Sequence, residues 1–214
     1  MEKMHDFFAA RIDEYDAQML TNVEGCKESY EALPTLLPDP CRRLLDLGCG
    51  TGLELEGIWQ YFPDIAVTGI DLTPEMLSRL KEKYPDKAMN LICGSYFDVP
   101  FGQEPYDCAI SVQTMHHFLR DEKISLYRKI YAALTENGRY IECDYMVDTQ
   151  AEEDSFRAQY AQLRKDAGIA EGEFYHFDIP FTVPNQIAML KAAGFVRVVQ
   201  VFRQGCTTIL VADK

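Results

Sequence analysis

The stretch "LLDLGCGTG", residues 44–52, constrains the fold of this chain more strongly than any other feature of its sequence. An apolar run leads into Asp46, and glycines follow at positions 48, 50 and 52. Glycines in a turn between a strand and a helix allow the backbone to approach a ligand closely. The stretch therefore predicts a buried strand, a ligand-binding loop and a helix in direct succession.

Short apolar runs alternate with helical patterns over the rest of the chain. The first five runs are almost continuously apolar, which is typical of parallel strands buried on both faces. The last two are joined only by residues 203–205, too short for a parallel crossover, so they must form an antiparallel hairpin. The strand candidates are residues 42–47, 65–71, 88–94, 106–112, 138–145, 196–202 and 206–212. The sequence thus predicts an α/β fold: a three-layer, Rossmann-like doubly wound sheet of seven strands, mainly parallel, with a C-terminal antiparallel hairpin.

Helices are expected between these strands. Thr73 is suited to cap the first helix and Pro74 to open it, because the fixed φ of proline fits the first helical position. Gly138 is expected to end the second helix. The helix candidates are residues 73–84, 121–138 and 183–195.

Two segments lie outside this alternation, and we expect both to serve one domain that spans residues 1–214. Residues 1–37 look helical and are expected to form a lid, while residues 148–182 look like a helix and a loop inserted on the substrate side. The lid should contain one helix with an apolar face. The residues that follow helical spacing there are Phe8, Ile12 and Tyr15.

The composition excludes several classes of protein. A net charge of −13 repels phosphate backbones, so we expect a small-molecule substrate and no nucleic acid. The seven cysteines are odd in number and include no CxxC pair, which argues against a disulfide framework and a metal site. The charged N-terminus lacks a signal-peptide core, and no apolar run is long enough for a membrane span. We therefore expect a cytoplasmic monomer or homodimer with no membrane partner.

The residues around the glycine loop discriminate between three ligands. A phosphate loop of the Walker type needs Lys and Ser or Thr after the last glycine, but Leu53 and Glu54 follow Gly52. A dinucleotide loop needs its third glycine one position later, and Asp46 and Glu54 would repel a pyrophosphate. S-adenosylmethionine (SAM) carries a sulfonium and an ammonium group and no phosphate. A carboxylate in front of the loop favours this third ligand.

Asp71 is placed to bind a nucleoside. It ends the second predicted strand about 25 positions after Asp46, near the spacing at which an acidic residue meets a ribose in nucleotide-binding folds. Both ribose hydroxyls can donate to one carboxylate. SAM and NAD share this requirement, so the choice of SAM depends on the loop, Asp46 and the terminal hairpin together.

The motifs "LLDLGCGTG", "GIDLTPEML", "CGSYFDVPF" and "YDCAISVQTMHHF" resemble, in this order, those of class I SAM-dependent methyltransferases of the small-molecule type. The resemblance covers about residues 40–145 and, in outline, the hairpin. It implies the sheet order 3-2-1-4-5-7-6, with SAM across the carboxyl ends of the strands. "RIDEYD" is similar to the lid of small-molecule members, where a Tyr, here Tyr15, contacts the methionine carboxylate. The family often has Gly-Asp where this chain has Gly94-Ser95, so Ser95 or a backbone group would hold the adenine amine.

These arguments together give a set of expected cofactor contacts. Cys49 is included as a small residue that packs beside SAM, because no base follows it in sequence that could make it a nucleophile. The expected cofactor-binding residues are Tyr15, Asp46, Gly48, Cys49, Gly50, Asp71, Leu72, Met76, Ser95, Tyr96 and Gln113.

The candidate substrate-pocket residues come from strand ends and from one aromatic-rich segment. His116 and His117 follow the fourth strand, and Asp144 ends the fifth. Such groups can act as a base or polar contact, or they can cap and pack under a helix. The segment 173–184 contributes Tyr175, His176 and Asp178, and Arg11 lies in the expected lid. We expect catalytic or substrate contacts from His116, Asp144, Tyr175, His176 and Arg11, and no metal ion.

Several functions remain open at this point. The leading prediction is in-line methyl transfer from SAM to a small molecule, with N, O, S or C as the accepting atom. A second is a SAM-using enzyme of another type, like carboxy-SAM synthases, for which Arg11 would supply positive charge near the methyl group. A non-catalytic SAM-binding regulator is a third possibility, and an NAD-dependent reductase is the most distant.

Overall fold

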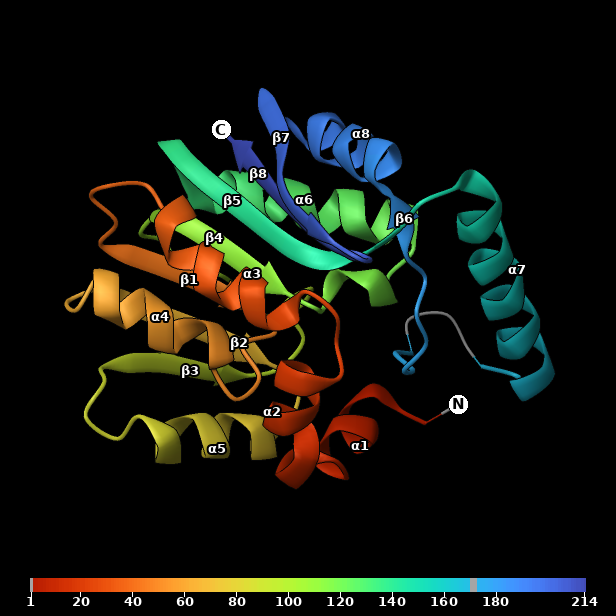
Figure 1. The fold of residues 1–214 in the computed structure, drawn as a ribbon, viewed down its shortest axis with the longest axis horizontal. Helices are drawn as coiled ribbons and strands as arrows, with labels where there is room; N and C mark the ends of the chain where they lie inside the picture. Colours follow the sequence, from red (N-terminus) through yellow and green to blue (C-terminus); the bar gives the residue numbers. More distant parts are fainter. Residues whose placement is uncertain (1, 170–172) are drawn as a thin grey trace.

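The computed structural model describes residues 2–169 and 173–214, and its centre is one mixed β-sheet (Figure 1). The strands run in the order β3-β2-β1-β4-β5-β8-β7. Neighbours from β3 to β5 are parallel, whereas β8 is antiparallel to both β5 and β7. The bounds are β1 Arg43–Leu47, β2 Ala66–Asp71, β3 Met89–Cys93, β4 Tyr106–Val112, β5 Leu134–Val147, β7 Arg197–Gln204 and β8 Thr207–Asp213. The predicted fold class and strand order are confirmed.

Helices cover both faces of the sheet, which gives the three predicted layers. On one face pack α3 (Cys26–Ala32), the 3₁₀ turn η1 (Leu33–Leu36), α4 (Leu53–Tyr61) and α5 (Pro74–Lys83). On the other pack α6 (Arg120–Ala133) and α8 (Val183–Ala193). Across residues 2–169 and 173–214, every helix is too short or too polar to span a bilayer.

The predicted helix 121–138 was wrong at its C-terminal end. Helix α6 stops at Ala133, and the chain enters β5 at Leu134. Tertiary partners explain the difference, since Leu134 pairs with Tyr106 of β4 and its carbonyl accepts a hydrogen bond from Lys214 Nζ at 2.7 Å. Gly138 therefore lies inside a strand instead of ending a helix.

The N-terminal stretch is also divided differently from the prediction of one helix. It forms α1 (Met4–Ala9) and α2 (Ile12–Thr21), with Arg11 between them at φ −116° and ψ 10°. This break lets α1 pack on the loop after α7 while α2 reaches the glycine loop. The side chain of Asp16 in α2 hydrogen-bonds to Thr51 and to Lys83 of α5.

The inserted segment begins with α7 (Gln150–Ala167), which lies beside the sheet at the end occupied by α1 (Figure 1). Thr149 and Glu152 form a capping box that starts this helix. After α7 the chain returns through a short strand that the sequence did not predict, β6 (Phe181–Thr182), which pairs with the last residues of β5. The expected insertion between the fifth and sixth strands is therefore partly tied to the sheet.

Candidate functional site

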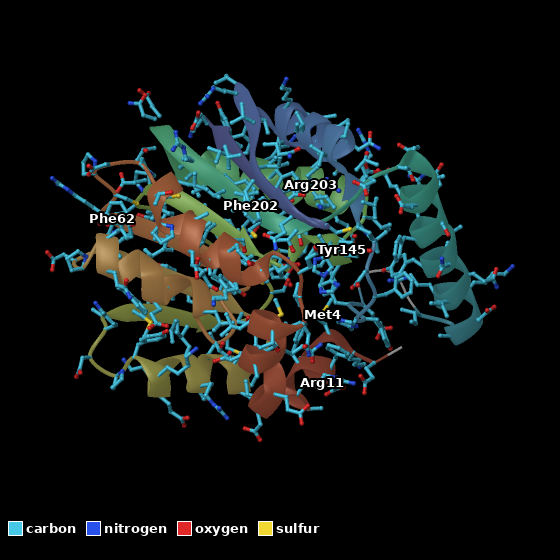
Figure 2. All side chains as sticks on the ribbon, viewed as in Figure 1. Met4, Arg11, Phe62, Tyr145, Phe202 and Arg203 are labelled. Atoms are coloured by element: carbon cyan, nitrogen blue, oxygen red, sulfur yellow. The ribbon has the colours of Figure 1, made fainter. Side chains whose placement is uncertain are left out.

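Two adjoining cavities open at the carboxyl ends of the parallel strands. The space within the first, counting the solvent at its mouth, is about 650 Å³, and that within the second about 1330 Å³. Figure 2 places Tyr145 at this end of the sheet, with Met4 of α1 and Arg11 of the α1–α2 junction nearby, and Phe62 at the opposite end. The residues that line both cavities are Phe8, Tyr15, Gln113 and His117. An occupant of one cavity would thus share a wall with an occupant of the other.

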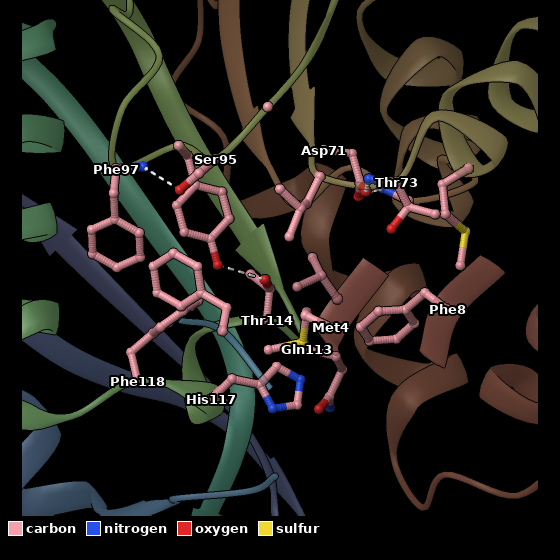
Figure 3. A pocket seen from close by; sticks show the side chains of 18 of the residues that line it. Met4, Phe8, Asp71, Thr73, Ser95, Phe97, Gln113, Thr114, His117 and Phe118 are labelled. Atoms are coloured by element: carbon pink, nitrogen blue, oxygen red, sulfur yellow. Dashed lines mark hydrogen bonds between the residues drawn. The ribbon is translucent and has the colours of Figure 1, made fainter. Parts of the chain in front are cut away.

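The first cavity gathers most of the predicted cofactor residues (Figure 3). Of the predicted set, Asp46 and Cys49 do not line it, whereas the others do. Cys49 instead borders a small adjacent hollow together with Tyr30 and Glu54. The predicted members that line the first cavity are Tyr15, Gly48, Gly50, Asp71, Leu72, Met76, Ser95, Tyr96 and Gln113.

Asp71 fixes the glycine loop as well as facing the first cavity. Its Oδ2 accepts a hydrogen bond from Gly50 N at 2.9 Å, and its Oδ1 accepts one from Thr73 N at 2.8 Å. Gly50 adopts φ +47°, a conformation that favours glycine. Each carboxylate oxygen keeps a further lone pair that can accept from a ribose hydroxyl. Burial raises the pKa of Asp71, although these backbone donors oppose the shift.

Behind the loop, Asp46 and Glu54 form a buried pair of carboxyl groups. Asp46 is 1% exposed and Glu54 5%. Within the described part of the chain, Asp46 Oδ2 and Glu54 Oε1 have no hydrogen-bond partner. Burial raises the pKa of Glu54 to about 7, and burial together with the charge of Glu54 raises the pKa of Asp46. Unpaired acceptors on a buried pair of carboxyl groups suit a ligand that brings a cationic donor, such as the ammonium group of SAM.

Aromatic side chains enclose the opposite end of the first cavity. Ser95 Oγ accepts a hydrogen bond from Phe97 N at 3.2 Å, and Tyr96 OH hydrogen-bonds to Thr114 Oγ1 at 3.0 Å (Figure 3). The ring of Phe97 stacks on that of Phe174, with centroids 5.5 Å apart. These planar surfaces suit an aromatic base such as adenine.

Sequence reasoning missed several residues that line the first cavity. Phe97, Thr114 and Phe118 lie within two of the methyltransferase-like motifs, so the sequence could have indicated that they line the cavity. Met4 and Phe174 come from distant segments, and only the folded chain brings them here. The missed residues include Met4, Phe97, Thr114, Phe118 and Phe174.

Gln113 lies where the two cavities meet, and its backbone is unusual. Among the described residues it is the non-glycine residue with positive φ, at +51°. Gln113 N donates to the carbonyl of Cys143 on β5 at 2.8 Å, which holds the chain in this conformation as it leaves β4. Backbone strain of this kind is commonly found where a side chain must be aimed at a ligand.

The second cavity contains a histidine held by a buried carboxylate. His116 lies in the 3₁₀ turn η2 (Met115–His117), which follows β4. Its Nδ1 lies 2.5 Å from Oδ1 of Asp144 on β5. Burial alone would lower the pKa of His116, but the charge of Asp144 and the hydrogen bond to it raise that pKa above its ordinary value. Asp144 does not line the cavity itself and reaches it through His116. The pairing leaves Nε2 of His116 on the side of Asp178, at 3.6 Å from Oδ1.

Two further histidines face the same cavity in their neutral form. His117 is 6% exposed, and burial and the nearby His116 lower its pKa well below the ordinary value. Burial also lowers the pKa of His176, whose ring stacks on Phe7 with centroids 3.5 Å apart. The structure thus brings together His116 and His176, which the sequence placed 60 residues apart.

Of the two remaining predicted substrate residues, one lines the second cavity and the other lines neither cavity. Arg11 lines the second cavity, but its guanidinium pairs with Glu2 at 3.1 Å and with the carbonyl of Phe7 at 2.9 Å. Tyr175 lines neither cavity and forms a backbone bridge with Lys3. Its position in the loop still matters, because this bridge joins α1 to the segment that carries His176.

Comparison with known proteins agrees with this geometry. Residues 44–138 match a family described as Methyltransferase domain. The carboxy-S-adenosyl-L-methionine synthase of Helicobacter pylori (strain P12) is 28% identical over 207 residues, covering 89% of this chain and 80% of that protein. The O-methyltransferase cnsE of Penicillium expansum is 26% identical over 83% of this chain. The chain spans 60% of the length of cnsE.

A solved structure shares this fold. Human N-acetylserotonin methyltransferase in complex with SAM superposes with a TM-score of 0.62 at 19% identity, over 87% of this chain and 51% of the human chain. The residues of the first cavity fit SAM, since they combine the strand-end carboxylate of Asp71 with a glycine loop and an aromatic wall. Residues 44–138 are thus similar to a methyltransferase domain, and the chain shares its fold with a methyltransferase solved in complex with SAM.

Proposed function

We propose that this protein transfers a methyl group from SAM to a small molecule bound in the second cavity. The observation that carries the proposal is the position of His116, held by Asp144 at the carboxyl end of β4, in a cavity that shares a wall with the first. Asp71, Asp46 with Glu54, and Tyr15 would hold the ribose and the methionine end of SAM, and Ser95 the adenine. Bound SAM would supply an electrophilic methyl group on its sulfonium.

His116 would hold the accepting atom in line for the transfer. Asp144 occupies Nδ1, so Nε2 is the nitrogen left to accept a hydrogen bond or a proton from an O–H or N–H of the acceptor. Gln113, which walls both cavities, is placed to fix the acceptor against the methyl group. Positioning of this kind is the main contribution that a protein makes to methyl transfer.

The charges of the second cavity favour an acceptor that is neutral or cationic. Its described lining contains Glu24 and Asp178 as acidic residues, and the guanidinium of Arg11 is already paired with Glu2. Aromatic rings from Phe7, Phe8 and Tyr145 complete the wall. We therefore expect an acceptor with an apolar body and at least one hydroxyl or amine group.

We propose further that residues 2–21 and the loop 173–178 form one lid over both cavities. Met4 N donates to the carbonyl of Phe174 at 3.1 Å, and His176 N donates to that of Glu2 at 3.0 Å, so the two segments pair through their backbones. Closing them would exclude water from the sulfonium. SAM should protect both segments from hydrogen exchange together, and protection of only one would separate them.

The proposed reaction can be tested without knowing the acceptor. Pools of small metabolites should be incubated with SAM and the full chain, and S-adenosylhomocysteine and methylated products measured by mass spectrometry. Once an acceptor is found, His116→Asn should lower kcat by about 100-fold or more while the Kd of SAM stays unchanged. His5→Asn, at an exposed histidine of α1, is the matched control and should keep full turnover. Full turnover in His116→Asn would remove His116 from the reaction.

A second candidate is synthesis of carboxy-SAM, which the Helicobacter pylori relative favours because it covers most of this chain. The product would carry an added carboxylate, which needs a cation near the methyl group. Within the described lining of the second cavity, Arg11 is the permanently charged cation. Mass spectrometry of SAM after incubation with carboxylic acid pools distinguishes the two reactions, because carboxylation increases the mass of SAM and methyl transfer yields S-adenosylhomocysteine.

A further inference from the structure

Three side chains that can bind metal ions meet in the second cavity. One ligand atom from each of His116, His117 and Asp178 lies within 4.8 Å of the others. Oδ1 of Asp178 is 3.6 Å from Nε2 of His116 and 3.6 Å from Nδ1 of His117. These separations are too long for hydrogen bonds, yet a tetrahedral ion with bonds of about 2.1 Å places its ligand atoms about 3.4 Å apart. The spacing suits an ion between the three side chains.

His116 is oriented in the way that metal-binding histidines usually are. Its Nδ1 is held by Oδ1 of Asp144 at 2.5 Å, and the same oxygen accepts a hydrogen bond from Tyr145 N at 2.9 Å. Asp144 is 1% exposed, so this carboxylate is fixed in the protein interior. A carboxylate on one imidazole nitrogen fixes the tautomer and leaves the other nitrogen as a better ligand.

The loop that carries Asp178 is attached to the turn that carries the histidines. Ile179 N donates to the carbonyl of His116 at 2.6 Å, and the carbonyl of Phe177 lies 3.1 Å from Nδ1 of His117. The side chain of Asp178 is 38% exposed, so it can turn toward the imidazoles without repacking of the core. The three ligands therefore belong to one local unit, although they come from distant parts of the sequence.

We propose that His116 Nε2, His117 Nδ1 and the carboxylate of Asp178 bind a divalent transition-metal ion such as Zn²⁺, with His117 Nδ1 exchanging its hydrogen bond to the Phe177 carbonyl for the ion. Two imidazoles and one carboxylate suit zinc, cobalt or iron, whereas Mg²⁺ and Ca²⁺ prefer oxygen ligands alone. All three residues line the second cavity, together with His176, so the open coordination position faces the acceptor.

This inference deepens the proposed function and rests on it only for the role of the ion. An ion on Nε2 takes the place of His116 as the contact to the acceptor. It would bind an oxygen or nitrogen atom of that molecule and lower the pKa of the proton there. Uptake of the ion is measured without SAM or acceptor, so a negative result would leave the methyl-transfer proposal untouched.

The test is a titration of the full chain, stripped with a chelator, with Co²⁺ followed by visible absorption. We expect one ion per chain, displacement by Zn²⁺ and no displacement by Mg²⁺. Asp178→Asn and His117→Gln should each raise the Kd of Co²⁺ at least tenfold. Asp178→Asn alters a partly exposed side chain, so its melting temperature without metal should match the wild type, and Zn²⁺ should raise that temperature in the wild type alone.

Controls must separate this cluster from the other histidines and from the cysteines. His5→Gln changes an exposed histidine, Cys93→Ser an exposed thiol, and Cys206→Ser a thiol that lines the same cavity. All three should keep the wild-type Kd, and the absorption spectrum should lack a band for sulfur bound to cobalt. Unchanged affinity in Asp178→Asn, or loss of binding in Cys206→Ser, would overturn the proposal.

Discussion

Glu54 and Glu142 are both buried glutamates, and burial raises the pKa of each to about 7, yet their surroundings differ. Glu142 lies between β-sheet and helices, where Tyr127 donates to its Oε2 at 2.7 Å and Gln186 to its Oε1 at 2.6 Å. The ammonium of Lys123 lies 3.9 Å from the same Oε1. Glu54, beside the glycine loop, keeps Oε1 without a hydrogen-bond partner in the described residues.

We propose that the difference separates a structural carboxylate from one that binds a ligand. Every oxygen of Glu142 is satisfied by the protein, so this network stabilises the fold only as long as all its members are present. The unsatisfied oxygens of Glu54 and Asp46 cost folding free energy that a cationic ligand can return. A raised pKa alone would not distinguish them, and the predictions below test the distinction.

The largest effect is expected from Glu142→Ala. Removing this carboxylate leaves the buried ammonium of Lys123 without its counter-charge, and such a loss costs roughly 3–5 kcal/mol of unfolding free energy. Urea unfolding measures this loss. The control is Glu136→Ala, at an exposed residue of the same strand, whose unfolding free energy should stay within about 0.5 kcal/mol of the wild type. The folded variant should bind SAM with wild-type affinity, and a large loss of affinity would mean that this network also supports the site.

Glu54→Gln should have the opposite effect to Glu142→Ala: it should weaken SAM binding and leave stability unchanged or higher. The amide removes the buried negative charge, so the ligand-free protein should be as stable as the wild type or more so. The Kd of SAM should rise by about tenfold to a hundredfold, because a hydrogen bond to a charged group contributes roughly 1.5–3 kcal/mol. Calorimetry measures the Kd, and unchanged SAM affinity together with lower stability would make Glu54 a structural residue like Glu142.

Asp71→Ala sharpens the comparison because Asp71 combines both roles. The carboxylate holds Gly50 N and Thr73 N and also faces the first cavity. We expect SAM affinity to fall by at least ~1.5 kcal/mol, with a smaller loss of stability from the two backbone donors. Asp71→Asn, which can still accept from one of them, should recover part of the stability but not the affinity. Equal SAM binding by a folded Asp71→Ala protein would contradict this assignment.

The smallest effect concerns pH. The pKa of Glu54 is about 7 in the folded chain and near 4.5 in an unfolded one, so the folded state binds more protons between these values. The stability of the ligand-free protein should therefore decrease as pH rises from 4.5 to 7, by less than about 1.4 kcal/mol per pH unit from this group. Glu54→Gln should flatten this part of a thermal denaturation profile, and an identical profile would show that Glu54 does not titrate there.

The sequence predicted the sheet and the lining of the first cavity better than the lining of the second. Asp46 and Asp71 follow buried strands, and the hydrophobic pattern of those strands fixes where their ends meet. The contacts of His176 and Asp178 with His116 could not be foreseen, because they depend on how a long loop folds back over the strand ends. The break at Arg11 and the early end of α6 at Ala133 likewise follow from tertiary partners that local propensity does not encode.

The wall that the two cavities share has a kinetic consequence. Phe8 and Tyr15 border both cavities, so in the proposed reaction the helices that must move to release a spent cofactor are the same ones that enclose the acceptor. Binding should then follow a compulsory order, with SAM first and the acceptor second. A new acceptor that enters before S-adenosylhomocysteine has left would trap it behind these helices. High acceptor concentrations should therefore inhibit turnover, and opening of the helices should set the maximal rate.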